Sequence, residues 1–144
     1  MEGKISGVTY IRVRYAETDK MGIVYYGNYL TYFEVARTEF VRSLGKAYSS
    51  FEARGFILPV LEAYVRYLGS ARYDDLLTVK TTLKKFSRVR LDFEYEITRD
   101  EGKIIAAGYT RHCWADIEGK PQRISDEIWG FFQSLQRRFS EAQS

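Results

Sequence analysis

The sequence has little of several features that would narrow its function at once: one cysteine, one histidine, two prolines and no long hydrophobic run. The single cysteine, Cys113, excludes an internal disulfide, and no apolar stretch approaches the ~18 residues of a transmembrane helix. Residues 1–10 lack the apolar segment of a secretory signal peptide. We therefore expect a cytoplasmic protein without a membrane span.

The charges are also unremarkable in number and in placement. The net charge is +3, and the charged residues are scattered along the chain. Proteins that bind nucleic acids usually concentrate basic residues on one face, so a nucleic-acid partner is not expected. A small polyanion, such as a phosphorylated cofactor, remains compatible with this charge.

Aromatic residues, in contrast, are abundant, with 12 tyrosines, 9 phenylalanines and 2 tryptophans. Tyrosine joins an apolar ring to a polar tip, which suits pockets and subunit interfaces as well as a core built of rings. The length is that of a single domain, which we assign to residues 1–144.

Hydrophobic periodicity predicts a strand over residues 8–15 and a long helix over residues 28–44. Alternation marks the strand, and apolar residues at steps of three and four mark the helix. Gly45 is placed to end this helix, because glycine readily adopts the left-handed backbone conformation found just after a helix. Apolar residues also widen the stripe of this helix, so we expect it to be enclosed by other elements rather than to rest on one of them.

The rest of the chain predicts four strands and a second helix. The strands are expected at 57–68, 76–86, 89–98 and 104–117, and the helix at 126–139. Ser125 is placed to cap this helix at its start, and Arg137 and Arg138 lie near its expected end. The order predicts an α+β protein with one antiparallel sheet and one dominant helix.

Most catalytic motifs are absent from the sequence. It has no glycine-rich phosphate loop, no G-x-S-x-G turn and no cluster with metal-ligand spacing, so we expect neither a metal nor a cofactor. His112 and Cys113 are neighbours on a predicted strand and point to opposite faces, which excludes a catalytic pair. We expect Cys113 to be packed in the interior and His112 to make a polar contact.

The stretch "YAETDKMGIVYYGNYLTYFEVARTEFVRSLG" at 15–45 is the best candidate for a site. The free N–H groups at a helix start stabilise a developing oxyanion, and Gly22 and Gly27 allow a ligand to approach the main chain. Asp19 precedes this helix start and is placed to act as a nucleophile or a general base. The alternative is that Asp19 only caps a turn, as aspartate often does.

The same stretch resembles the opening motif of the 4-hydroxybenzoyl-CoA thioesterase-like family, the hotdog-fold acyl-CoA thioesterases, and in particular their Tol-Pal-associated type. The motif is Y-x-x-T-D-x-x-G-x-V-Y-x-x-N-Y, followed by F-E-x-A-R. Two later segments extend the resemblance over most of the chain: "VRYLGSARYDDLLTVKTTL" and "GKIIAAGYTRHCWAD…GKPQRI".

This resemblance implies a hotdog fold, in which a curved antiparallel sheet wraps around a long central helix. It implies that Asp19 attacks the thioester or activates water, and that a main-chain amide at about Tyr25–Tyr26 polarises the carbonyl. Other hotdog thioesterases carry their acid on the central helix, which makes Glu34 the second candidate. Family members are homodimers or, commonly, homotetramers with active sites at subunit boundaries.

One residue departs from the pattern of the Tol-Pal-associated type. Many of its members have histidine where this chain has Tyr26. Tyrosine, with an ordinary pKa of ~10, is a poor base near neutral pH. More of the chemistry therefore rests on Asp19, while Tyr26 is left to donate a hydrogen bond or to contact the acyl group.

The expected activity is hydrolysis of a small acyl-CoA to the free acid and CoA. Lys84, Arg88 and Arg90 lie around a predicted hairpin and are candidates to bind the CoA phosphates, although a solvated hairpin explains them equally well. Two alternatives remain open. One is a non-catalytic module that binds an acyl or hydrophobic ligand, and the other is a hotdog lyase that acts on an acyl thioester.

Overall fold

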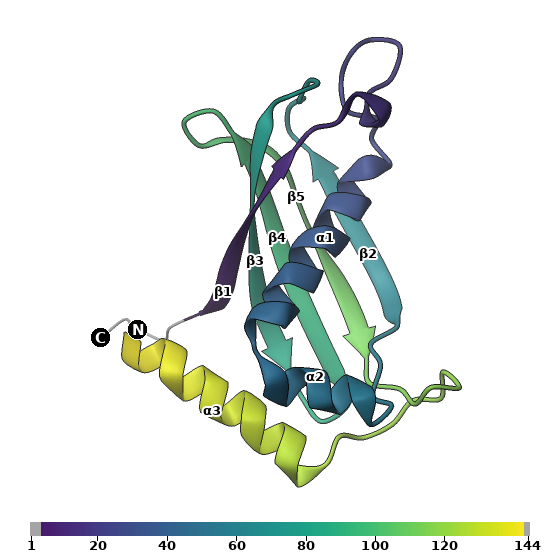
Figure 1. The fold of residues 1–144 in the computed structure, drawn as a ribbon, viewed down its shortest axis with the longest axis vertical. Coiled ribbons are helices and arrows are strands. Elements are labelled where there is room, and N and C mark those ends of the chain that lie inside the picture. The colour runs from purple at the N-terminus through teal and green to yellow at the C-terminus, as the bar shows by residue number, and fades with distance from the viewer. Residues whose placement is uncertain (1–3, 143–144) are drawn as a thin grey trace.

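The computed structural model describes residues 4–142 and contains one five-stranded antiparallel sheet and three α-helices (Figure 1). The strands are β1 (Ile5–Arg12), β2 (Val60–Tyr67), β3 (Leu76–Phe86), β4 (Arg90–Arg99) and β5 (Lys103–Cys113). The helices are α1 (Asn28–Ser43), α2 (Lys46–Ala53) and α3 (Asp126–Ala142), with a short 3₁₀ turn η1 (Tyr15–Glu17). The strand order is β1-β3-β4-β5-β2, so β1 and β2 form the two edges.

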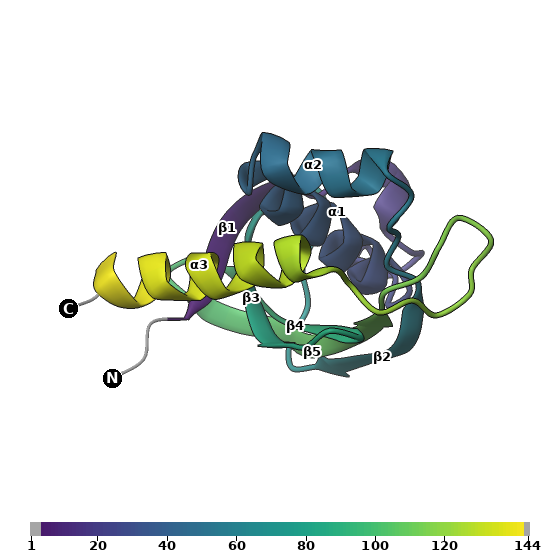
Figure 2. The same ribbon diagram turned by 90° about the horizontal axis from the view of Figure 1, so that it is seen from below.

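The sheet curves around α1, which lies against its concave face (Figure 2). Alternate strand residues face α1 and are buried, as Leu91, Phe93, Tyr95 and Ile97 of β4 illustrate. Phe33 of α1 stacks on Tyr95 with ring centroids 4.3 Å apart. A curved antiparallel sheet around a long helix is the hotdog fold, so the predicted α+β class and architecture are confirmed.

Two strands end earlier than their alternation predicts. The strand expected at 8–15 is β1, which is shifted toward the N-terminus. Its predicted last residue instead begins η1, because the Tyr15 carbonyl accepts hydrogen bonds from both the N–H and the hydroxyl of Thr18. The strand expected at 104–117 is β5, which ends at Cys113 before an irregular loop.

Helix α2 is not predicted by the periodicity of the sequence. Its Tyr48 and Phe51 are buried, and Tyr48 lies 6.3 Å from the ring of Trp114, so distant segments stabilise this short helix. The expectation that other elements wrap around α1 is confirmed for the face toward the sheet, while part of the opposite face stays exposed (Figure 2). Leu30 and Val35 of α1 are each 42% exposed.

Helix α3 begins where the sequence predicts it, because the Ser125 hydroxyl accepts a hydrogen bond from the N–H of Ile128 at 3.3 Å. The helix continues to Ala142, so Arg137 and Arg138 do not lie in its last turn, contrary to the expectation. No helix within residues 4–142 is long and apolar enough to cross a membrane.

Candidate functional site

The segment before α1 folds back on itself as a short antiparallel pair (Figure 1). Thr18 bridges to Val24, and the carbonyl of Glu17 accepts a hydrogen bond from the N–H of Tyr25 at 2.9 Å. The side-chain amide of Asn28, the first residue of α1, donates to the same carbonyl at 2.8 Å. These contacts fix the base of the segment, at Glu17 and Thr18, to the start of the helix.

Asp19 stands at the tip of this segment and is half-buried. Its Oδ1 accepts hydrogen bonds from the N–H groups of Met21 at 2.8 Å and Ile23 at 3.4 Å. Gly22, with φ at 81°, makes the turn possible, because a side chain rarely tolerates this conformation. The second carboxylate oxygen of Asp19 makes no hydrogen bond within residues 4–142 and is left available.

Asp116 forms a turn with the same hydrogen bonds elsewhere in the chain. Its Oδ1 accepts from the N–H groups of Glu118 and Lys120, and Gly119 has a φ of 86°. In both turns the aspartate caps the second and fourth residues that follow it. A capped turn alone is therefore no sign of catalysis, and what distinguishes Asp19 is that its segment is hydrogen-bonded, through Glu17, to the start of α1.

The start of α1 narrows the choice between the two predicted amides. The Tyr25 N–H is used by Glu17, as described above. The N–H groups of Tyr26 and Gly27 make no hydrogen bond within the part of the chain that the structure describes. Of the two predicted amides, Tyr26 is therefore the one whose N–H is free to donate, at the positive end of the helix dipole.

A cluster of tyrosines surrounds this helix start. The Tyr26 ring lies 4.6 Å from that of Tyr25 and 6.2 Å from that of Tyr67, and Tyr67 lies 5.6 Å from Tyr29. The Tyr67 hydroxyl donates to the Tyr26 carbonyl at 3.2 Å. Sequence reasoning missed Tyr67, because only the folding of β2 against α1 brings it here. The high tyrosine content of the chain is the one feature of the sequence that hinted at such a cluster.

Glu17 links the same region to the core. Its carboxylate accepts hydrogen bonds from the Tyr32 hydroxyl at 2.9 Å and from Arg14. Burial raises the pKa of Tyr32 well above its usual range, and the hydrogen bond to Glu17 raises it further. Tyr32 therefore stays protonated and holds Glu17, whose carbonyl anchors the segment that carries Asp19.

The second candidate acid, Glu34, lies on α1 and is exposed. It makes no ion pair or hydrogen bond within the described residues. Glu34 precedes Thr38 by one helical turn, on a stripe that leads into the cavity described below. The Glu34 carboxylate is therefore unpaired within the described residues, and no neighbouring side chain positions it for catalysis.

The three cations predicted to bind CoA each have a carboxylate partner. Lys84 lies 4.0 Å from Glu94 and Arg90 lies 3.4 Å from Asp92. Arg88 is 2.7 Å from Asp126 and also covers the ring of Trp129. Their role in binding CoA stays a prediction.

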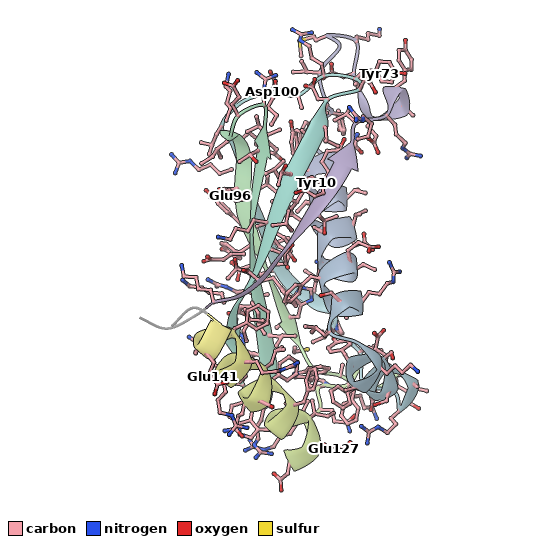
Figure 3. The ribbon with its side chains drawn as sticks, turned by 60° about the vertical axis from the view of Figure 1, so that its left-hand side comes forward. Tyr10, Tyr73, Glu96, Asp100, Glu127 and Glu141 are labelled. Atoms are coloured by element: carbon pink, nitrogen blue, oxygen red, sulfur yellow. The ribbon has the colours of Figure 1, made fainter. Side chains whose placement is uncertain are left out.

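These cations also lie at the far end of the sheet from Asp19. The η1 turn contacts Tyr73 at one end, whereas Arg88 pairs with the residue next to Glu127 at the other (Figure 3). Within one chain, the structure does not bring Lys84, Arg88 and Arg90 to the predicted site. The turn of Asp19 contains Lys20, and a second cation, Arg72, lies close to it, with its Nη1 3.6 Å from the position of a Cβ on Gly22.

Asp19 lines neither of two well-formed cavities on the described surface. One is beside the C-terminal half of α1, and the other is on the outer face of the sheet. Across residues 4–142, no group of histidine, cysteine and acidic side chains is arranged to hold a metal ion. The segment before α1 thus provides a carboxylate and free amides, but one chain does not enclose them.

Comparison with known proteins identifies relatives over most of the chain. A family model described as the thioesterase-like superfamily matches residues 13–135. The YneP protein of Bacillus subtilis is 35% identical over 108 residues, which cover 75% of this chain and 78% of that protein. The acyl-CoA thioesterase YbgC of Haemophilus influenzae is 30% identical over 126 residues, which cover 87% and 93%.

A solved structure resembles the fold closely. The DHNA-CoA thioesterase of Staphylococcus aureus superposes with a TM-score of 0.83 at 37% sequence identity, with 95% of each chain covered. Assignment to the Tol-Pal-associated type stays a prediction.

Proposed function

Because the chain belongs to the thioesterase-like superfamily, we propose that it hydrolyses the thioester of a small acyl-CoA to the free acid and CoA. The names of its relatives support this activity. The observation that carries the proposal is that one short segment before α1 holds both a capped carboxylate, Asp19, with one oxygen available, and the free amide of Tyr26.

The chemistry requires only these two groups. The thioester oxygen accepts a hydrogen bond from the Tyr26 N–H, which stabilises the negative charge that develops when the carbonyl is attacked. Asp19 attacks the carbonyl carbon and forms a mixed anhydride that water then cleaves, or it takes a proton from an attacking water. CoA leaves as a thiolate, which needs no general acid because thiols have an ordinary pKa of ~8.5.

The Tyr26 side chain serves binding in this proposal rather than proton transfer. It is 62% exposed and packs between the rings of Tyr25 and Tyr67. Such a cluster presents flat faces to an acyl group, so aromatic acyl-CoAs are the first class to test. This arrangement accounts for a site that works without the histidine of many relatives.

We further propose that the active protein is a homodimer joined through β2. This edge strand has no partner on one side, and nearly all its residues are exposed, including Leu61 and Tyr64. An exposed apolar edge is a template for pairing with a second chain. Full antiparallel pairing of two copies places Val60 of one chain opposite Tyr67 of its partner, and the tetramer expected for the family adds a second interface.

The competing function is a module that binds an acyl ligand without cleaving it. The cavity away from Asp19 is the observation that favours it, since that cavity offers an apolar pocket without a catalytic group. A panel of short aliphatic, long aliphatic and aromatic acyl-CoAs separates the two functions when binding and thiol release are measured on the same samples. Thiol release that depends on Asp19 supports the enzyme, and tight binding without any thiol release supports the module.

A further inference from the structure

A cavity of about 610 Å³ opens between the C-terminal half of α1, helix α2 and residues 56–58. The proposed mechanism makes no use of it. Its apolar wall consists of Val41, Tyr48, Phe56, Ile57 and Leu58. Lys46 and Glu52 stand at its exposed rim. Its size and lining suit a small ligand with an apolar body.

The cavity is lined by three cations, Arg37, Arg42 and Lys46, of which Arg37 of α1 is half-buried and the other two are exposed. The Arg37 guanidinium donates one hydrogen bond, from Nη1 to the Tyr95 hydroxyl at 3.1 Å. No carboxylate in residues 4–142 forms an ion pair with Arg37, and its remaining donors are not used within that range. Arginine binds carboxylates through two parallel hydrogen bonds, so these free donors select an anionic oxygen.

A chain of buried hydrogen bonds holds Arg37 in place. The Tyr95 hydroxyl lies 2.6 Å from the hydroxyl of Thr110, which lies 2.8 Å from Nε2 of His112. Nδ1 of His112 lies 3.0 Å from the carbonyl of Leu58. The chain therefore joins α1, through β4 and β5, to Leu58 on the opposite wall of the cavity.

The direction of each hydrogen bond in this chain follows from its two ends. The Leu58 carbonyl only accepts, so Nδ1 of His112 carries a proton. Burial lowers the pKa of His112 and favours the neutral ring, which leaves Nε2 to accept from Thr110. Thr110 then accepts from Tyr95, whose oxygen accepts from Arg37. Each hydrogen bond of the chain thus has one donor and one acceptor. Together they hold the Arg37 guanidinium in place through a single N–H, and its other N–H groups stay available.

We infer that this cavity receives the far end of the acyl group, and that Arg37 selects substrates with an ionised oxygen there, a carboxylate or a phenolate. The inference rests on the proposed function and on the proposed pairing of β2. The Tyr67 hydroxyl holds the Tyr26 carbonyl at the start of α1, and Val60 follows the Ile57–Leu58 wall after one residue. Since pairing sets Val60 opposite the partner's Tyr67, the cavity of one chain faces the Asp19 segment of the other.

Substrate preference tests the role of Arg37. Benzoyl-CoA, 4-hydroxybenzoyl-CoA and 4-carboxybenzoyl-CoA share one ring and differ only in the substituent at its far end, which is a hydrogen, a hydroxyl group or a carboxylate. We expect Arg37→Met to lower kcat/KM for a preferred oxygenated ester by roughly 10–100-fold and for benzoyl-CoA by less than about threefold. Arg37→Lys, which keeps the charge, should fall between, and Arg138→Met on α3 is the matched control. Equal losses for all three esters would overturn the inference.

A mixed dimer tests whether the cavity serves the partner. Asp19→Asn and Arg37→Met chains with different tags are co-expressed, and the dimer that carries both tags is isolated. If Arg37 acts across the interface, one of its two sites keeps both residues, and the mixed dimer has about half of the wild-type turnover of the oxygenated ester. If Arg37 acts within its own chain, neither site is intact and turnover stays at the level of the single variants, which would overturn the inference.

Equilibrium binding separates this inference from the proposed function. Should no thioester be cleaved, calorimetry with free benzoate and benzene-1,4-dicarboxylate still probes the cavity. We expect the dicarboxylate to bind roughly tenfold more tightly to the wild-type protein, and Arg37→Met to remove that difference. Identical affinities in both proteins would refute the role of Arg37, whatever the outcome of the hydrolysis assay.

Discussion

The substitution Asp19→Asn removes the carboxylate and keeps the turn that carries it. Oδ1 of asparagine can still accept the hydrogen bonds from Met21 and Ile23. We therefore expect the free energy of unfolding to change by less than about 1 kcal/mol, or about 2–4 °C in Tm for a chain of this size. Asp19→Ala loses both hydrogen bonds and should cost about 1–3 kcal/mol.

The effect on turnover should be far larger than the effect on stability. A positioned general base contributes ~10²–10⁴ to the rate, which corresponds to roughly 3–5 kcal/mol of activation free energy. Thiol release from a good aromatic acyl-CoA measures this loss under saturating and subsaturating conditions. Most of the loss should appear in kcat, because Asp19 acts on the carbonyl in the transition state rather than on CoA in the ground state.

Asp116→Asn is the matched control for this experiment. Asp116 caps the same kind of turn, in a loop far along the chain from α1. Its substitution should change stability by a similar amount and turnover by less than about twofold. If Asp19→Asn kept more than about a tenth of the activity, or if both variants lost it equally, the assignment of Asp19 would be refuted and Glu34 would be tested next.

Four further predictions concern packing, protonation, charge and assembly. Gly108→Ala should cost at least about 1–3 kcal/mol, since its Cβ would lie 2.0 Å from a main-chain oxygen of β2, whereas Gly130→Ala in α3 meets no atom and should raise Tm. Burial lowers the pKa of His112, so the unfolded chain binds more protons below pH ~6.5, and the urea midpoint should fall between pH 7 and 5 more steeply than in His112→Gln. Arg88→Ala tests the predicted phosphate contact: a tenfold rise in the inhibition constant of CoA would support it, whereas a change of less than about threefold would favour the solvated hairpin, in which Arg88 is paired with Asp126. Leu61→Asp should shift the protein toward a monomer in analytical ultracentrifugation and reduce turnover with it, whereas a fully active monomer would contradict the β2 interface.

Local patterns were sufficient to predict most of the fold. The alternation of 89–98 corresponds to β4, and the stripe of 28–44 corresponds to α1, which ends before Gly45 with φ at 89°. Periodicity reports which face of an element is apolar, and here that face is also the buried one. Helix α2 was not predicted, because it is stabilised by contacts with segments far away in sequence: Tyr48 packs against Trp114, and Phe51 packs against Phe131.

The candidate site was predicted only in part. Asp19 and the amide at Tyr25–Tyr26 come from one continuous segment, so the sequence contains their whole local geometry. The hydrogen bond from Tyr67 and the chain from Arg37 to Leu58 join residues that meet only in the folded sheet. No spacing along the sequence encodes such contacts, and the sequence equally gives no sign that β2 lies at the edge of the sheet.

We propose that this chain breaks a thioester with one carboxylate and one main-chain amide, and isotope labelling shows whether the thioester is hydrolysed at all. The wild-type protein is incubated with one equivalent of an aromatic acyl-CoA in ¹⁸O-water, and the products are counted by mass spectrometry. Hydrolysis predicts one free CoA, one free acid and one ¹⁸O atom incorporated for each ester consumed. The ¹⁸O is in the acid if Asp19 activates the attacking water, and it is in the Asp19 carboxylate if water opens a mixed anhydride on the Asp19 side. An ester that is bound tightly and recovered intact would contradict the claim and leave a binding protein in its place.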